Sequence, residues 1–180
     1  MATYIGWFFL SLWMADFITG FVHWFEDSYC VRGLPIIGEL ICDPNLDHHD
    51  DPSLMVRTGT FLSRNYIQWS LGAAGALVLA YFESLTPFWA LTIFISTFGN
   101  EVHRWNHTTR HNSALIEWFK DVGIIQAQRQ HSMHHREPFD TNYCTMTSQL
   151  NPILDTIKFW RALELFIEAF TYIKPRRLRD

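Results

Sequence analysis

The chain has 180 residues, of which 48% are apolar and 16% aromatic, and its formal net charge is −4. This composition suffices for one folded domain and excludes a disordered chain. Because the basic residues are scattered until the tail, no basic patch is present and nucleic acid is excluded as a partner. Long uncharged aromatic runs alternate with segments dense in His, Asp, Asn and Arg, which is typical of a membrane enzyme with a polar head.

The first apolar segment runs from Tyr4 to Trp24, about the length that crosses a hydrocarbon core. It lacks a basic leading region and a small-residue cleavage site, so we expect a membrane helix and not a removable signal. The second segment (66–82) and the third (88–102) flank a short turn at residues 83–87 and predict a helical hairpin. Each arm is short for a full span, so tilt or partial insertion is expected.

Two amphipathic patterns follow, over residues 115–122 and 150–170, with apolar residues three and four positions apart. Such helices lie in a membrane surface or pack on the polar head. Pro152 suits the first turn of the second one. The expected fold is a single all-α domain over residues 1–180. It is an integral-membrane helical bundle with three to four membrane-embedded helices, interfacial amphipathic helices and a histidine-rich head.

The order of the segments also predicts a topology. A hairpin returns the chain to the side that it left, so His23 and His103 meet on one side of the membrane. The basic tail contains Lys174, Arg176, Arg177 and Arg179. By the positive-inside rule it places that side in the cytoplasm or a stroma-like equivalent.

The three cysteines are odd in number and form no C-x-x-C pair (Cys30, Cys42 and Cys144). This pattern indicates neither a disulfide framework nor a thiolate zinc site. We therefore expect free thiols in a reducing compartment.

Eight of the nine histidines fall into four groups, one of them His23 alone and the others HH, HxxxH and HxxHH. Residues four apart share a helix face, so His103 and His107 can bind one ion. Since one ion rarely takes more than six ligands, eight imidazoles predict two ions. The eight are His23, His48, His49, His103, His107, His131, His134 and His135. The ninth, His111, lies roughly 12 Å from His103 along a helix axis and is expected to be a solvated surface residue.

Acidic and amide residues near these histidines are candidates for orienting them. Asp16, Gly20, His23 and Asp27 form one stripe on the first helix, and either aspartate could accept the outer N–H of a ligand imidazole. Asp51 either plays this role or caps a turn. Asn100 and Glu101 flank HxxxH as ligands, as orienting groups or as an exposed polar edge.

Several motifs together resemble the Kua/CarF lipid desaturases. They are ADFITGFVHWFED, LDHHDDP, NEVHRWNH, RQHSMHHREPFDTNYC, LNPILD and FWRALE, and they span residues 15 to about 175. The resemblance implies a non-haem di-iron centre held by the eight histidines, O2 as co-substrate, and an external electron donor such as a small cytochrome or ferredoxin. Two departures concern Glu101, where relatives typically have Gln, and the Arg57-Thr58-Gly59 run, where the animal enzyme has Arg-His-Asp.

The resemblance implies a membrane phospholipid desaturase that forms a double bond near the headgroup end of a lipid chain. Conversion of a plasmanyl to a plasmenyl (vinyl ether) lipid is the first expectation, and trans-desaturation of a phosphatidylglycerol acyl chain is the alternative. The residues leave hydroxylation open. A transmembrane haem electron carrier is the alternative of another class, although adjacent histidines suit a compact metal cluster better than separated porphyrins.

Overall fold

The computed structural model describes residues 2–108 and 112–178, and all regular structure in this part of the chain is helical. The elements in chain order are α1 (Ala2–Tyr29), η1 (Gly38–Cys42), α2 (Asp43–Asp50), α3 (Leu54–Arg57), α4 (Phe61–Tyr81), α5 (Pro87–Ser96), α6 (Gly99–His107), α7 (Ala114–Asp121), α8 (Gln128–His134), α9 (Leu150–Thr156), α10 (Phe159–Thr171) and η2 (Arg176–Leu178). The expected all-helical class is confirmed. His111 and Arg179 lie outside the described residues.

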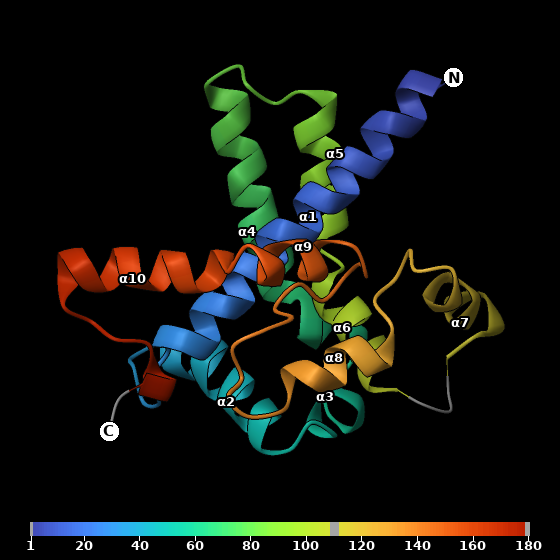
Figure 1. Cartoon of the computed structure of the whole chain (residues 1–180). Coiled ribbons are helices and arrows are strands. Elements are labelled where there is room, and N and C mark those ends of the chain that lie inside the picture. The colour runs from blue at the N-terminus through green and yellow to red at the C-terminus, as the bar shows by residue number, and fades with distance from the viewer. Residues whose placement is uncertain (1, 109–111, 179–180) are drawn as a thin grey trace.

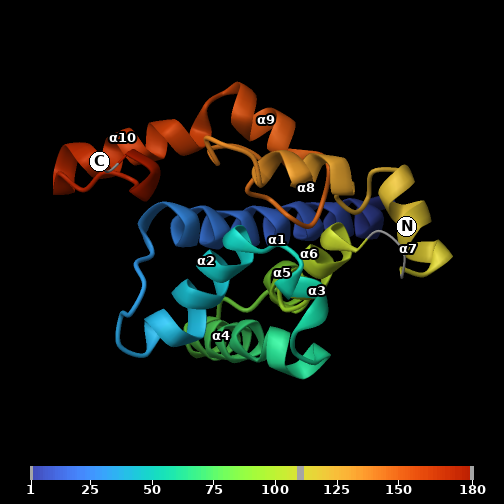
Figure 2. The ribbon, with the colours of Figure 1, turned by 90° about the horizontal axis from the view of Figure 1, so that it is seen from below.

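Helix α1 runs through the whole molecule (Figures 1 and 2). Its first half projects upward beside α4 and α5, and its second half enters a head that contains α2, α3, α6 and α8 (Figure 1). Seen from below, α1 lies between the segment that carries α8–α10 and the segment that carries α2–α4 (Figure 2). The metal-ligand candidates therefore come from the lower half of α1 and from the segments beside it.

The hairpin of α4 and α5 forms where the sequence predicted it. Glu83 adopts a left-handed φ of 53° just after α4, and the Thr86 side chain accepts a hydrogen bond from the Trp89 N–H at 3.4 Å to begin α5. Pro87 occupies the first turn, where its missing N–H is not needed. The hairpin prediction is confirmed.

The third apolar segment does not continue to residue 102 as one helix. The Trp69 indole N–H donates to the Thr97 carbonyl at 3.1 Å, and the Glu101 N–H bonds to the carbonyl of Phe98. The helix therefore breaks after Ser96 and restarts at Gly99. A Cβ at Gly99 would lie 3.0 Å from the Thr19 methyl, so the glycine lets α6 approach α1 closely.

The second amphipathic segment is also divided. Lys158 has a left-handed φ of 54° and separates α9 from α10. Helix α10 extends sideways, across the direction of the hairpin (Figure 1). Its Leu165, Phe166 and Phe170 side chains are 51%, 61% and 73% exposed, so this face has no cover within the described residues.

One helix of the described chain, α1 over Thr3–Tyr29, is long and apolar enough to cross a membrane, while α5 is apolar but shorter. Large apolar side chains of α1 and α4 are exposed, among them Tyr4, Trp7, Leu71 and Leu77. The buried core lies in the head instead, where Trp24 packs with Tyr143 and Trp160. Exposed apolar surface of this extent marks a membrane or partner contact.

Candidate metal centre

The structure brings the eight predicted histidines together as two adjoining groups. The first group consists of His48, His103, His107, His131 and His135. The second consists of His23, His49, His134 and the carboxylate of Asp27. Within each group one ligand atom from every member lies within 4.8 Å of all the others.

Adjacent histidines belong to different groups. Successive residues of a helix point about 100° apart, so His48 faces one group and His49 the other. The same separation assigns His134 and His135 to different groups, while His131 and His135, four positions apart, share one. Each double histidine therefore connects the two groups, and the rings of His49 and His135 have centroids 4.7 Å apart.

In the first group the Nε2 atoms nearly touch. His103 and His131 have Nε2 atoms 2.8 Å apart, His107 and His131 2.7 Å, and His103 and His107 3.2 Å. N–H···N bonds cannot satisfy all three contacts of such a triangle, because each ring nitrogen either donates or accepts. Nitrogens that bind one ion at about 2.1 Å in adjacent positions lie about 3 Å apart. The first group thus fits a metal ion.

The second group contains its own negative charge. Asp27 Oδ1 lies 2.9 Å from His49 Nε2, and Oδ2 lies 3.1 Å from His134 Nε2 and 3.6 Å from His23 Nε2. Asn45 Nδ2 donates to Oδ1 at 2.7 Å and fixes the carboxylate.

Backbone carbonyls set the tautomers of two rings in this group. His23 Nδ1 donates to the Tyr143 carbonyl at 3.0 Å, and His134 Nδ1 donates to the Thr141 carbonyl at 2.9 Å. A neutral ring that donates from Nδ1 has its lone pair on Nε2, where it faces the Asp27 carboxylate. The Nε2 lone pairs and the negative carboxylate repel each other, and a cation bound between them would remove this repulsion. This donor set therefore also fits a metal ion.

Burial keeps the first group neutral. Desolvation, followed by the influence of His107, lowers the pKa of His48 to about 2. Desolvation also lowers the pKa of His107 to about 3 and holds the pKa of His131 well below its usual range. Neutral imidazole is the form that binds a metal, so these rings are ready to do so at neutral pH.

The tight packing of the rings also bears on the haem alternative. Four Nε2 contacts between 2.7 and 3.2 Å within one group leave no space for a porphyrin between the rings. A compact metal cluster fits the geometry, and separated haems do not.

The stripe predicted on α1 packs against the segment 143–147. The Asp16 carboxylate accepts from the Met146 N–H at 2.8 Å and from the Thr147 hydroxyl at 2.6 Å. The expectation that Asp16 orients an imidazole is therefore wrong: its partners belong to the segment that orients His23. A Cβ at Gly20 would lie 2.6 Å from Cys144 Sγ, so this segment rests directly on the α1 backbone.

Three further residues, predicted as possible orienting residues for the histidines, have other partners. Asp51 accepts from Ser53 and pairs with Arg57, as a turn-capping residue does. Asn100 Nδ2 donates to the Arg64 carbonyl at 2.7 Å. Glu101 is buried and pairs with two arginines, and it belongs to neither metal-ligand group.

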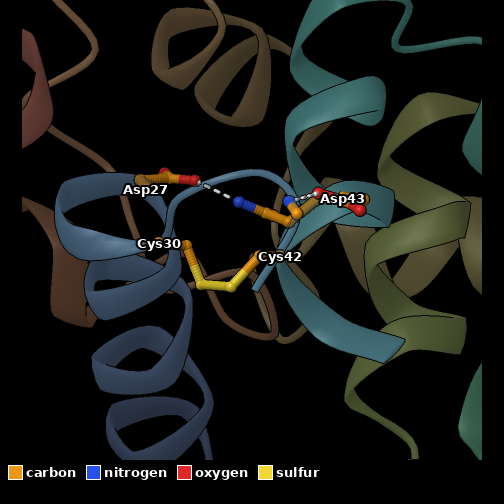
Figure 3. The surroundings of a disulfide bond; sticks show 6 residues. Asp27, Cys30, Cys42 and Asp43 are labelled. Atoms are coloured by element: carbon orange, nitrogen blue, oxygen red, sulfur yellow. Dashed lines mark hydrogen bonds between the residues drawn. A yellow bond between two sulfur atoms is a disulfide. The ribbon is translucent and has the colours of Figure 1, made fainter. Parts of the chain in front are cut away.

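Cys30 and Cys42 form a disulfide (Figure 3). The expectation of three free thiols is wrong for this pair, and Cys144 alone is a free, buried cysteine. No C-x-x-C motif predicts this bond, because the two residues are 12 positions apart and meet only when the chain turns after α1. The bond joins the end of α1, three residues after Asp27, to the start of α2, which carries His48 and His49.

A cleft of about 750 Å³ reaches the first group from the hairpin. Its apolar walls come from α1 (Ile18, Val22) and from α4 and α5 (Ile67, Leu71, Ile93). Its polar part contains His23, His48, His103, Glu26 and Arg64. Glu26 and Arg64 were not predicted, since each lies in a helix without any pattern that distinguishes it from a solvated charge.

The chain resembles known proteins along nearly its whole length. The model of the lipid desaturase domain family matches residues 12–178. The chain is 34% identical over 176 residues to plasmanylethanolamine desaturase 1 of Mus musculus, an alignment that covers 91% of the chain and 64% of the mouse protein. It is 31% identical over 171 residues to a probable fatty acid desaturase of Acanthamoeba polyphaga mimivirus, covering 93% and 84%.

A plant relative is more distant. The chain is 28% identical over 166 residues to the chloroplastic fatty acid desaturase 4 of Arabidopsis thaliana, covering 91% of the chain and 51% of that protein. No solved structure matches. The chain thus spans less than two thirds of the mouse protein and about half of the plant protein. With the family model matched over residues 12–178, the chain belongs to the lipid desaturase family.

Proposed function

We propose that this chain is a membrane phospholipid desaturase that binds two iron ions and uses O2 to form a double bond near the headgroup end of a lipid chain. The single observation that carries the proposal is the cleft: apolar along the hairpin, it ends at His23, His48 and His103. The conversion of a plasmanyl to a plasmenyl lipid is the reaction we assign, in agreement with the name of the mouse relative.

The chemistry requires a cofactor. No acid or base among the side chains can break an unactivated methylene C–H bond, so an oxidant must be supplied. Two bound iron ions would supply it with O2, and the overall balance is lipid, O2, two electrons and two protons giving the unsaturated lipid and two waters. The electrons come from an external donor, a small cytochrome or ferredoxin.

The chain's own residues bind and position the partners of this reaction. The eight histidines and Asp27 would hold the ions, and the carbonyls of Thr141 and Tyr143 aim two of the rings. The cleft holds the lipid chain beside His48 and His103 and shields it from water. Since proximity accounts for a large share of such barriers, the cleft decides which carbons react.

The proposed placement in the membrane is multi-pass. Helices α1, α4 and α5 enter the bilayer, and the exposed apolar face of α10 lies in its surface. The basic tail, which packs on α10 through the Arg177–Glu164 ion pair at 2.6 Å, supports a cytoplasmic or stroma-like position of the metal head. The disulfide argues for the opposite side, because disulfides persist mainly in oxidising compartments. Protease protection of a C-terminal epitope tag in sealed vesicles decides between them: a protected tag would overturn the cytoplasmic placement.

The function is tested by expressing the chain in a host that lacks vinyl ether lipids but makes their alkyl precursors. Acid-labile vinyl ethers are expected with the unchanged chain and not with His131→Ala. New trans-unsaturated acyl chains on phosphatidylglycerol would instead support acyl-chain desaturation, in line with the name of the plant relative, fatty acid desaturase 4. A metal-loaded chain with a competent donor that alters no lipid would refute desaturation.

A further inference from the structure

The polar part of the cleft contains one arginine. Arg64 lies in the first turn of α4 and lines the cleft together with Thr58, Ser63 and Asn100. The lining continues along α4 to Gly75, eleven positions further, or about 16 Å along the helix axis. The cleft thus has a charged end at the start of α4 and an apolar end within the hairpin.

The guanidinium of Arg64 is held in place before any ligand binds. Its Nη1 donates to the carbonyls of Thr58 at 3.1 Å and Gly59 at 2.8 Å. The turn requires glycine, because Gly59 has a φ of +72° and a Cβ there would lie 2.8 Å from Ser63 Oγ. Nη2 donates to Glu101 Oε2 at 3.1 Å.

Donor capacity remains after these contacts. A guanidinium has five N–H groups, and the three contacts use three of them. Arg64 Nε is buried and has no partner in the described chain. An unpaired buried donor is costly, so an acceptor at this position would be favourable.

The cluster around Arg64 carries a net positive charge. Glu101 pairs with Arg64 and, through Oε1 at 2.6 Å, with Arg104, so two positive charges face one negative charge. Arg104 does not line the cleft. The acidic residues of the lining belong to α1, η1 and α2 (Glu26, Glu39 and Asp47), so an anion is directed to the α4 wall.

The cluster is also close to the metal-ligand groups. Asn100 Nδ2 donates to the carbonyl of Arg64 at 2.7 Å. Asn100 precedes His103 on α6 by three positions, about 4.5 Å along the axis. The backbone of Arg64 is therefore about one helical turn from a metal ligand.

We propose that Arg64 binds the phosphate of the phospholipid substrate and thereby fixes which carbons of its chain lie beside His48 and His103. This assignment rests on the proposed function, because it takes the cleft to be the lipid site. Arginine suits the task, since its planar fork binds phosphate oxygens in pairs.

The test is a binding measurement on the metal-loaded chain in detergent micelles. Two tritiated probes are compared: a 1-alkyl-2-acyl-glycerophosphoethanolamine and the 1-alkyl-2-acylglycerol that lacks the phosphate. Arg64→Gln should weaken binding of the phospholipid about 10- to 100-fold, the range for charge-assisted hydrogen bonds, and leave binding of the neutral lipid unchanged. Arg64→Lys should fall between, and Arg104→Gln, which removes a charge outside the cleft that pairs with the same Glu101, should weaken phospholipid binding less than Arg64→Gln does.

Several outcomes would overturn the assignment. An equal loss for both probes would show a structural role, and unchanged phospholipid binding would place the phosphate elsewhere. Displacement of the phospholipid by millimolar inorganic phosphate would identify the ligand as a free anion. Metal content and helicity of each variant verify folding. Because the assay needs no turnover, its result stands apart from that of the desaturation test.

Discussion

Replacement of Asp27 by asparagine tests whether the second group holds its own ion. Asparagine keeps the size of the side chain and an oxygen that can accept a hydrogen bond from Asn45. It removes the negative carboxylate, which supplies one of the four ligand atoms of that group. Side chains that only orient a ligand change metal affinity 10–100-fold, so the loss of a direct ligand should cost at least about that much. We expect the bound metal to fall from two ions per chain toward one.

The assay is elemental analysis by mass spectrometry of purified chain after dialysis against a graded series of chelator concentrations. Asp51→Asn is the matched control, since the Asp51 side chain is exposed to solvent and its described hydrogen bonds go to Ser53 and Arg57. It should keep two ions at unchanged affinity. Two ions retained by Asp27→Asn at the affinity of the unchanged chain would refute the ligand assignment.

Three further predictions concern the histidines and the disulfide. His107→Ala should abolish turnover, and His111→Ala should be tolerated; near-normal turnover of the first, or a folded but inactive form of the second, would contradict the ligand set. Because the pKa of His48 is lowered to about 2 and that of His107 to about 3, the unfolded chain takes up protons below pH 6.5 while the folded chain does not. The free energy of unfolding of the metal-free protein should therefore decrease as the pH is lowered from 6.5 toward 3, by about 1.4 kcal/mol per pH unit for each such ring. Thermal unfolding across a pH series measures this dependence. A free energy of unfolding that does not change with pH would argue against the burial of these rings. Cys42→Ser opens a short loop and should lower the free energy of unfolding by about 3 kcal/mol, measured by denaturant titration, whereas Cys144→Ser should not remove a cross-link; equal effects would speak against the disulfide.

The all-helical class and the hairpin could be predicted because both depend on local rules. Pro87 and the polar residues before it can begin a helix but not continue one, so the turn between α4 and α5 is visible in the sequence. The histidine spacing is local too: positions three and four apart share a helix face whatever the rest of the chain does. This is why the histidines of HxxxH and HxxHH could be named as candidate ligands without a structure, although His131 and His134 lie in different groups.

Other features depend on contacts between distant residues, and no local pattern contains them. His23 meets the Tyr143 carbonyl across 120 positions, and Asp16 meets Thr147 across 131, so the role of Asp16 as the anchor of a loop was not visible. The break after Ser96 depends on the Trp69 indole, which takes a carbonyl that the helix would otherwise use. The Cys30–Cys42 bond likewise required the turn that follows α1.

The sequence by itself determined which imidazoles are available and on which helices they lie, since the periodicity of a helix is set by the backbone. Only the tertiary structure decided how they divide into two groups, that the Asp27 carboxylate joins one of them, and that the cleft passes Arg64 on its way to His103. The physical reason is that a shared ligand position exists only where α1, α2, α6 and α8 converge, and the packing of these helices sets that convergence.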